Sequence, residues 1–205
     1  MERALNTYFI TGINHNISFL SSLISHPRFK IGELNTNFII DEYPEGYDPS
    51  SINHVDIGLY VCVVACLHFI HQERELKISG QLHRTLQKPL NEWTVIIAGQ
   101  RHEVNVVSVD TGFTVVFDET VNNIQTNWKF GDPIFESKIN DTEVCIQVDC
   151  KSFGYNISHS GCQIEAVVLN SKASKLYTFM PEKLKVETFQ YLYAPIPGLL
   201  TSIEV

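Results

Sequence analysis

The sequence lacks a surplus of positive charge. It has 15 Lys and Arg against 23 Asp and Glu, a formal net charge of −8, and no run of basic residues offsets that average. Nucleic-acid-binding proteins present a clustered basic surface to the phosphates, so the composition argues against a nucleic-acid partner. The start, "MERALNTYFITG", also lacks the charged, then apolar, then small-residue order of a secretory signal.

Cysteine is scarce, at 5 of 205 residues. A small, odd number of cysteines fits reduced thiols in a cytosol-like compartment better than a disulfide framework. The phosphate-binding patterns G-x-x-x-x-G-K-[ST] and G-x-G-x-x-G are absent from the sequence. The sequence therefore shows no signature of a nucleotide site or of a disulfide-stabilised fold.

Two pairs of potential ligands lie in one hydrophobic run. Cys62 and Cys66 are four residues apart, and His68 and His71 are three apart. They lack the CxxC or HExxH spacing of zinc sites, which need a convergent set of ligands. The apolar surroundings favour small core residues over a metal site.

The remaining cysteines offer two further hypotheses. Cys145 and Cys150 form a C-x4-C without a second pair, so a zinc site is disfavoured. A thiol enzyme could combine Cys162, His159 and Asp149, but no local signature supports it. We predict no catalytic, cofactor-binding or metal-binding residue, and keep the thiol enzyme as an alternative that rapid alkylation of Cys162 would support.

The longest hydrophobic run extends from Ile57 to Ile70. It is shorter than the roughly 18 to 20 residues of a membrane span and longer than a strand of about 5 to 6 residues. It is also apolar on every side, whereas a surface helix has one apolar stripe. We predict a helix over residues 55–74 surrounded by protein, with Asn53 as its N-cap and Asp56 in its first turn.

From Trp93 onward the hydrophobic pattern alternates with a period of two, which is typical of half-buried strands. Turn residues separate the segments, including Gly99-Gln100, Asn122-Asn123 and Ser160-Gly161. The predicted strands are WTVIIAG, RHEVNVVSVD, GFTVVFD, NIQTNWKF, PIFESKI, TEVCIQVD, GYNISHS and CQIEAVVLN. We predict an α+β fold in which a long central helix is wrapped by an eight-stranded antiparallel β-barrel.

The segments on either side have other patterns. In residues 1–47, "ERALNTYFI" and "NISFLSSLISH" have helical character, the second ending before Pro27. The following "GELNTNFIIDEYPEGYDPSS" is typical of a short strand followed by a loop. Residues 170–183 are predicted to be weakly helical or irregular. The last residues, "LLTSIEV", read as a strand without a partner, so we expect both ends to belong to truncated domains.

A long connection of residues 76–92 joins the predicted helix to the first strand. Connections of this length in a compact domain are usually functional or disordered. Its mixture of apolar and basic residues disfavours a disordered linker and indicates a partner-binding projection.

Two stretches resemble the α subunits of propionyl-CoA carboxylases, in the family of biotin-dependent acyl-CoA carboxylases. The elements G-[IV]-x-H-N, H-P-R-F-x-x-G and T-x-F-I-x-x-x-Y-P-x-G-[FY], at 12–16, 26–32 and 36–47, resemble the end of the biotin carboxylase domain. "APIPGLLTSIEV" at 194–205 resembles the opening of a biotin carboxyl carrier domain. The resemblance implies three regions: 1–50, a remnant of the biotin carboxylase domain; 51–183, the linking (BT) domain; and 184–205, a linker and first carrier strand.

The resemblance also implies a function for the region between the two stretches. The parent enzyme carboxylates propionyl-CoA with ATP, bicarbonate, biotin and Mg²⁺ (or Mn²⁺), but its catalytic, ATP-binding and biotin-bearing residues are expected outside this chain. What remains is assembly with the carboxyltransferase β subunit and the other α-subunit domains, in the cytoplasm of a bacterium or the mitochondrial matrix of a eukaryote. In the family a hook after the central helix contacts the β subunit, which maps here to about residues 77–91. The contact residues that this implies are Ile78, Leu82, His83, Leu86, Pro89 and Leu90.

Two further alternatives stay open at this point. The equivalent region of a methylcrotonyl-CoA or acetyl-CoA carboxylase shares the expected architecture. A stand-alone β-barrel that binds a small apolar ligand would instead need an empty interior.

Overall fold

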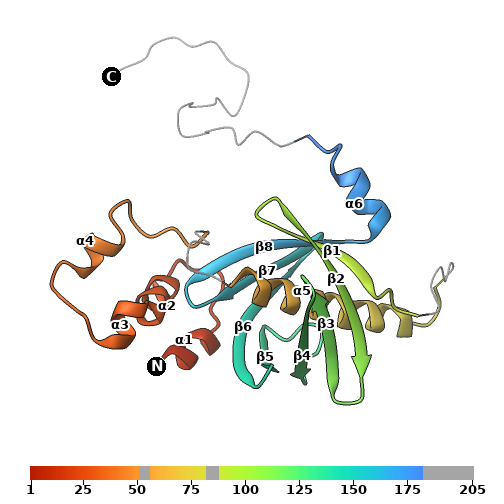
Figure 1. Ribbon diagram of the computed structural model, residues 1–205, viewed down its shortest axis with the longest axis horizontal. Coiled ribbons are helices and arrows are strands. Elements are labelled where there is room, and N and C mark those ends of the chain that lie inside the picture. The colour runs from red at the N-terminus through yellow and green to blue at the C-terminus, as the bar shows by residue number, and fades with distance from the viewer. Residues whose placement is uncertain (51–55, 82–87, 182–205) are drawn as a thin grey trace, which may run out of the picture.

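A computed structural model describes residues 1–50, 56–81 and 88–181. Within these residues eight strands form one closed antiparallel barrel in chain order, with β8 paired to β1. A long helix, α5, runs through the barrel, the short helices α1 to α4 lie at one end, and α6 lies beside β1 and β8 (Figure 1). The helices are α1 (Glu2–Thr7), α2 (Ile17–Ser25), α3 (Pro27–Ile31), α4 (Phe38–Glu42), α5 (Ile57–Lys77) and α6 (Ser171–Tyr177). The strands are β1 (Glu92–Ile97), β2 (Gln100–Val109), β3 (Gly112–Phe117), β4 (Thr120–Thr126), β5 (Ile134–Ile139), β6 (Thr142–Lys151), β7 (Gly154–His159) and β8 (Cys162–Leu169).

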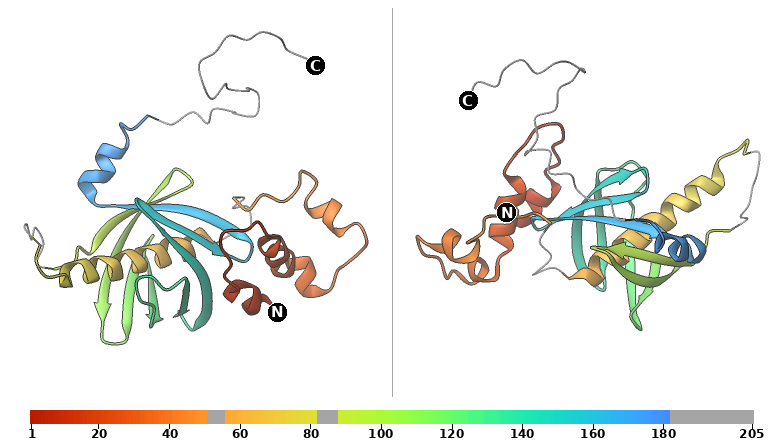
Figure 2. Two further views of the ribbon diagram at one scale, coloured as in Figure 1. Left: turned by 180° about the vertical axis from the view of Figure 1, so that it is seen from behind. Right: turned by 90° about the horizontal axis from the view of Figure 1, so that it is seen from above.

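The predicted α+β fold is confirmed. Every residue of α5 from Tyr60 to Leu67 is buried, which is more than two helical turns without an exposed face. A helix can be buried on all sides only when protein surrounds it, and the inward side chains of the strands supply that enclosure. The last turns of α5 project beyond the barrel, as the second view of Figure 2 shows.

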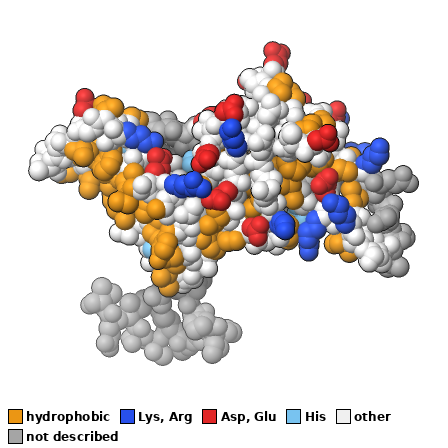
Figure 3. Space-filling view, turned by 90° about the horizontal axis from the view of Figure 1, so that it is seen from below, with side chains coloured by type: hydrophobic (Ala, Val, Ile, Leu, Met, Phe, Trp, Pro, Cys, Tyr) orange, Lys and Arg blue, Asp and Glu red, His pale blue; other side chains and the backbone are white. Residues whose placement is uncertain are grey.

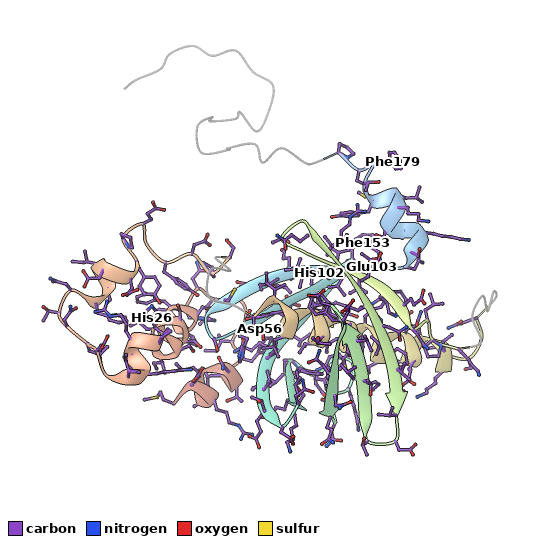
Figure 4. All side chains as sticks on the ribbon, in the orientation of Figure 1. His26, Asp56, His102, Glu103, Phe153 and Phe179 are labelled. Atoms are coloured by element: carbon purple, nitrogen blue, oxygen red, sulfur yellow. The ribbon has the colours of Figure 1, made fainter. Side chains whose placement is uncertain are left out.

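The start of α5 differs from the prediction. Asp56 is the N-cap, and its carboxylate accepts a hydrogen bond from the Leu59 amide at 3.3 Å (Figure 4). Asn53, the expected N-cap, lies outside the described residues. Asp56 is equally suited to this role, because a short side-chain oxygen acceptor satisfies one of the free amides of the first turn.

Tight turns explain how short strands close into a ring. Four of the hairpins turn on two residues, both with positive φ, the geometry that matches the twist of paired strands. These turns are Ala98-Gly99, Asp118-Glu119, Asn140-Asp141 and Ser160-Gly161. The connection between β4 and β5 is longer, and these two strands pair only over Ile124 to Thr126.

The predicted turn at Asn122-Asn123 is wrong, since both residues lie within β4. Their polar groups close the short β4–β5 seam instead. The Asn123 backbone N–H donates to the side-chain oxygen of Asn140 at 2.9 Å. The side-chain nitrogen of Asn140 donates to the side-chain oxygen of Asn122 at 2.7 Å. Asparagine satisfies backbone groups in a turn or beside a strand, so composition alone placed the turn too late in the chain.

The prediction of a short strand in the stretch that begins "GELNTNFIIDEY" is also wrong, because residues 38–42 form the helix α4. A helix places Phe38 and Glu42 on one face, four residues apart. There Phe38 is buried against the His26 ring, with ring centroids 5.3 Å apart, and Glu42 pairs with Arg28. These tertiary contacts outweigh the β-propensity of the apolar residues.

Asn6 of α1 is buried and helps to fasten the N-terminal helices to the barrel. The Asn6 carboxamide oxygen accepts from the Ser21 hydroxyl at 3.0 Å and from the Ser160 amide at 3.2 Å. The Asn6 backbone carbonyl accepts from the Gln147 side chain at 3.0 Å. Asn6 therefore joins α1 to α2, to β6 and to the β7–β8 turn.

The same turn is in close contact with α2. A Cβ placed on Gly161 would lie 2.5 Å from the Ser18 carbonyl oxygen, and the φ of Gly161 is +83°. The Tyr47 hydroxyl donates to the Gly161 carbonyl, and the Gln163 amide donates to the Pro49 carbonyl at 2.7 Å. We call this set of contacts around Asn6 and Gly161 the joint.

Candidate interaction site

The loop after α5 leaves the barrel from the projecting end of that helix. Arg74 and Lys77 lie in the last turn, where positive charge is favourable beside the unpaired carbonyls. Basic side chains lie toward this end of the molecule, with acidic side chains among them (Figure 3). The helix ends at Lys77, and the Gln81 side chain donates to the Glu75 carbonyl at 2.7 Å. The first leg of the loop, residues 78–81, thus continues from the helix end.

The second leg, residues 88–91, returns along α5. The Leu90 amide donates to the Gln72 side-chain oxygen at 2.7 Å, and the Trp93 indole N–H donates to the Leu90 carbonyl at 3.0 Å. The Val106 amide then donates to the Asn91 carbonyl at 2.8 Å, which extends the β1–β2 ladder into the leg. Both legs are therefore anchored to the end of α5 or the adjoining sheet.

The structure locates half of the predicted contact residues. Ile78 lies on the first leg with 46% of its surface exposed, while Pro89 and Leu90 lie half-buried on the second leg. Leu82, His83 and Leu86 lie outside the described residues.

A groove of about 770 Å³ lies at the foot of the second leg. Its apolar lining comes from Phe69, Pro89, Leu90 and Val107, which belong to α5, the leg and β2. Charged side chains also line it: Glu73, Lys88, Glu92 and Lys172. Apolar and polar side chains occur together in protein interaction sites.

A buried polar network lies where α5 leaves the barrel. The Tyr155 hydroxyl of β7 lies 3.2 Å from His68 Nδ1 and 3.4 Å from His71 Nδ1. Burial, with a smaller contribution from the neighbouring His71, lowers the pKa of His68 to about 4, so His68 is neutral at pH 7. The His68 ring also packs edge-on against Trp93, at 4.4 Å between centroids. The network holds the helix to two walls of the barrel, a structural role.

The three residues of the thiol-enzyme hypothesis, Cys162, His159 and Asp149, are not arranged as a catalytic triad. Burial raises the pKa of the Cys162 thiol to about 11, so the reactive thiolate is scarce at pH 7. His159 Nδ1 lies 2.8 Å from the Cys145 carbonyl, and the Asp149 carboxylate pairs with Lys151 at 2.5 Å. Asp149 therefore does not orient His159 as the third member of a triad would.

The described residues also lack metal-binding and membrane-spanning features. Among them, no group of three or more His, Cys, Asp and Glu side chains could hold a metal ion. Nor, within the described ranges, is there a helix with the length and hydropathy to span a membrane.

A larger cleft of about 1610 Å³ lies between α1 and the barrel end where α5 begins. Its described lining includes two basic residues, Arg3 and Lys138. Arg3 pairs with Glu136 and Glu143, at 3.5 and 3.2 Å, and Lys138 pairs with Asp141 at 2.7 Å. The basic side chains are thus already neutralised, which argues against a site for the phosphates of ATP or coenzyme A.

Sequence reasoning missed the two residues that anchor the second leg, Gln72 and Trp93. Gln72 is one of several polar residues at the helix end, and its partner Leu90 lies 18 residues away. Trp93 had a weak signal, since a buried indole N–H usually finds an acceptor. No local pattern indicated that the acceptor would be in the loop.

Comparisons with known proteins found a matching family model and several relatives of this chain. A family model described as propionyl-coenzyme A carboxylase BT domain matches residues 61–183. The propionyl-CoA carboxylase alpha chain of Ruegeria pomeroyi is 29% identical over 206 residues, which cover 100% of this chain and 30% of that protein. The human mitochondrial alpha chain is 26% identical over 210 residues, covering 100% of this chain and 29% of that protein. A shorter match, 51% identical over 39 residues, covers 19% of this chain and 6% of the methylcrotonoyl-CoA carboxylase subunit alpha of Dictyostelium discoideum. The chain spans about 30% of the length of the first two relatives.

Proposed function

The chain belongs to the family of propionyl-coenzyme A carboxylase BT domains, and from this premise we propose that it is a non-catalytic assembly region of such an enzyme. It holds a biotin carboxylase domain and a biotin carrier domain to the carboxyltransferase β subunit. The observation that carries the proposal is the family match over the barrel, together with a loop anchored at both legs on the projecting helix.

The proposed division of labour assigns the chemistry to other parts of the enzyme. The parent enzyme carboxylates propionyl-CoA with ATP, bicarbonate, biotin and Mg²⁺ or Mn²⁺. The described residues offer no metal-binding cluster and no free basic pair for phosphates in the larger cleft. We assign no residue of this chain to a cofactor. The location follows that of the parent enzyme, in the cytoplasm of a bacterium or the mitochondrial matrix of a eukaryote.

The proposed regions follow the same layout. Residues 1–50 continue a biotin carboxylase domain, 51–183 form the linking domain, and 184–205 lead into a carrier domain. Exposed apolar side chains over the N-terminal helices, such as Ile31 at 69% and Ile40 at 70%, support contact with a larger body (Figure 3).

The test is binding to a purified propionyl-CoA carboxylase β subunit, measured by co-elution and by titration. Ile78→Asp places a charge on the first leg and should weaken binding about tenfold or more. Val121→Asp is the matched control, because Val121 is 58% exposed on the barrel wall. The double variant Leu82→Asp, Leu86→Asp extends the test to the remaining predicted contacts, with circular dichroism unchanged. Binding that all three variants retain would contradict the assignment of the loop.

A second candidate is the equivalent region of a methylcrotonyl-CoA or acetyl-CoA carboxylase. The 39-residue match to the methylcrotonoyl-CoA enzyme favours keeping it. Titrating the chain against β subunits of each enzyme separates the candidates. The stand-alone ligand-binding barrel is disfavoured, because α5 occupies the barrel interior.

A further inference from the structure

Leu90 has an unusual environment for a loop residue, because both of its backbone polar groups bind side chains from other elements. Its N–H donates to Gln72 of α5 at 2.7 Å, and its C=O accepts from Trp93 of β1 at 3.0 Å. Surface loops usually satisfy these groups with water or within the loop. The peptide groups on either side of Leu90 are therefore fixed by the domain.

Of the two residues that hold Leu90, Trp93 is itself fixed by its packing. Trp93 is buried and packs edge-on against His68, which is in turn bonded to Tyr155. The Leu90 side chain packs against the core, and the following carbonyl, of Asn91, continues the sheet ladder. These hydrogen bonds and packing contacts hold the second leg against α5.

The two legs also take their anchors from one short piece of helix. The first leg is held at the Glu75 carbonyl, and the second at the Gln72 side chain, three residues earlier. The spacing between the legs is thus set by α5, whose own position is set by the barrel.

We propose that Gln72 and Trp93 are positioning residues, which hold the second leg in the orientation that the partner binds. The inference rests on the proposed function, because it gives these residues a role in binding the carboxyltransferase β subunit. A leg ordered before binding avoids part of the conformational entropy that association would otherwise lose.

The experiment compares four variants of the full chain. Gln72→Met removes the acceptor with little change in shape, and Gln72→Glu keeps an acceptor oxygen. Trp93→Phe keeps an aromatic ring but removes the N–H donor. Gln163→Met, at an exposed position of β8, is the control for introducing methionine. Two quantities are measured: hydrogen exchange of the Leu90 amide by NMR, without partner, and affinity for the β subunit.

Gln72→Met should raise the exchange rate of the Leu90 amide about tenfold, the effect of one hydrogen bond, and weaken binding about fivefold to tenfold. Trp93→Phe should weaken binding similarly, while Gln72→Glu and Gln163→Met should resemble the wild type. Unchanged Leu90 exchange in Gln72→Met would overturn the anchoring. Faster exchange with unchanged affinity would overturn the positioning role. A wild-type chain that binds no β subunit, yet shows the exchange difference, would overturn the proposed function instead.

Discussion

Replacing Gly161 by alanine should loosen the joint between the N-terminal helices and the barrel. The added Cβ would lie 2.5 Å from the Ser18 carbonyl and from the backbone nitrogen of Ser22, both in α2. Backbone atoms of a helix cannot move aside locally, so either the turn or the whole helix must shift. Such a shift would break the contacts of Ser160 and Gly161 with Asn6 and Tyr47.

The magnitude has two parts, which a matched variant separates. An L-residue in the left-handed conformation costs about 1 to 2 kcal/mol, and overpacking costs about 1 to 3 kcal/mol more. Gly99 occupies the same place in the β1–β2 turn, with φ +78° and no atom within 4 Å of the position that an added Cβ would take. Gly99→Ala therefore has only the backbone cost, and Gly161→Ala should lose about 1 to 3 kcal/mol more.

The assay is urea unfolding followed by circular dichroism and by tryptophan fluorescence. Trp93 and Trp128, the tryptophans of the sequence, are both buried in the barrel. If the helices detach before the barrel unfolds, the dichroism of Gly161→Ala should change at lower urea than its fluorescence. Limited proteolysis in native buffer should likewise cut residues 1–50 faster in Gly161→Ala than in Gly99→Ala.

Equal losses of stability in the two alanine variants would refute the reasoning. That result would mean that α2 does not rest on the β7–β8 turn, and that the joint does not fix the N-terminal helices.

Two further predictions concern buried ionisable groups. Alkylation by iodoacetamide should modify the exposed Cys150 first and leave the buried Cys66 unmodified in the native chain; mass spectrometry with Cys66 modified first would contradict the burial of α5. Because the folded pKa of His68, about 4, lies below its unfolded value of about 6.5, the unfolded chain binds the proton first, and stability should fall as pH drops from 6.5 to 4, by up to about 3 kcal/mol. The His68→Gln variant should lose this fall in the free energy of unfolding, measured by urea titrations between pH 6.5 and 4. If the difference in unfolding free energy between wild type and variant does not change with pH, His68 is not buried in its neutral form beside Tyr155.

The sequence was sufficient to predict the main architecture for a physical reason. The run from Ile57 to Ile70 was too uniformly apolar for any surface position, and the alternating segments after Trp93 had one apolar face each. A helix that needs enclosure and strands that need a core constrain each other. The pairing of each strand with its sequence neighbours then followed from the short turns.

Errors arose where distant contacts decided the local structure. Residues 38–42 form a helix because Phe38 and Glu42 both pack on α3 and its N-cap, which the segment alone does not reveal. The turn before β4 uses Asp118 and Glu119, which are less typical of positive φ than the asparagines nearby.

The candidate site could be located only in outline. Loop length and composition indicated a projection after the helix, and the resemblance to carboxylase subunits supplied its expected role. The anchoring by Gln72 and Trp93 depends on hydrogen bonds between side chains and a backbone group of a distant loop residue. Such pairs leave no periodic signal in a single sequence.

The order of the barrel elements has a consequence for synthesis. The ribosome releases α5 before any strand that covers it, and the ring closes only when β8 pairs with β1, through Ala166 to Leu169. Until then the apolar surface of α5 is only partly covered by strands. Pairing of the first strand with the last is a slow step, because the two are far apart in the sequence. Nascent chains that stop short of β8 should therefore aggregate or engage chaperones.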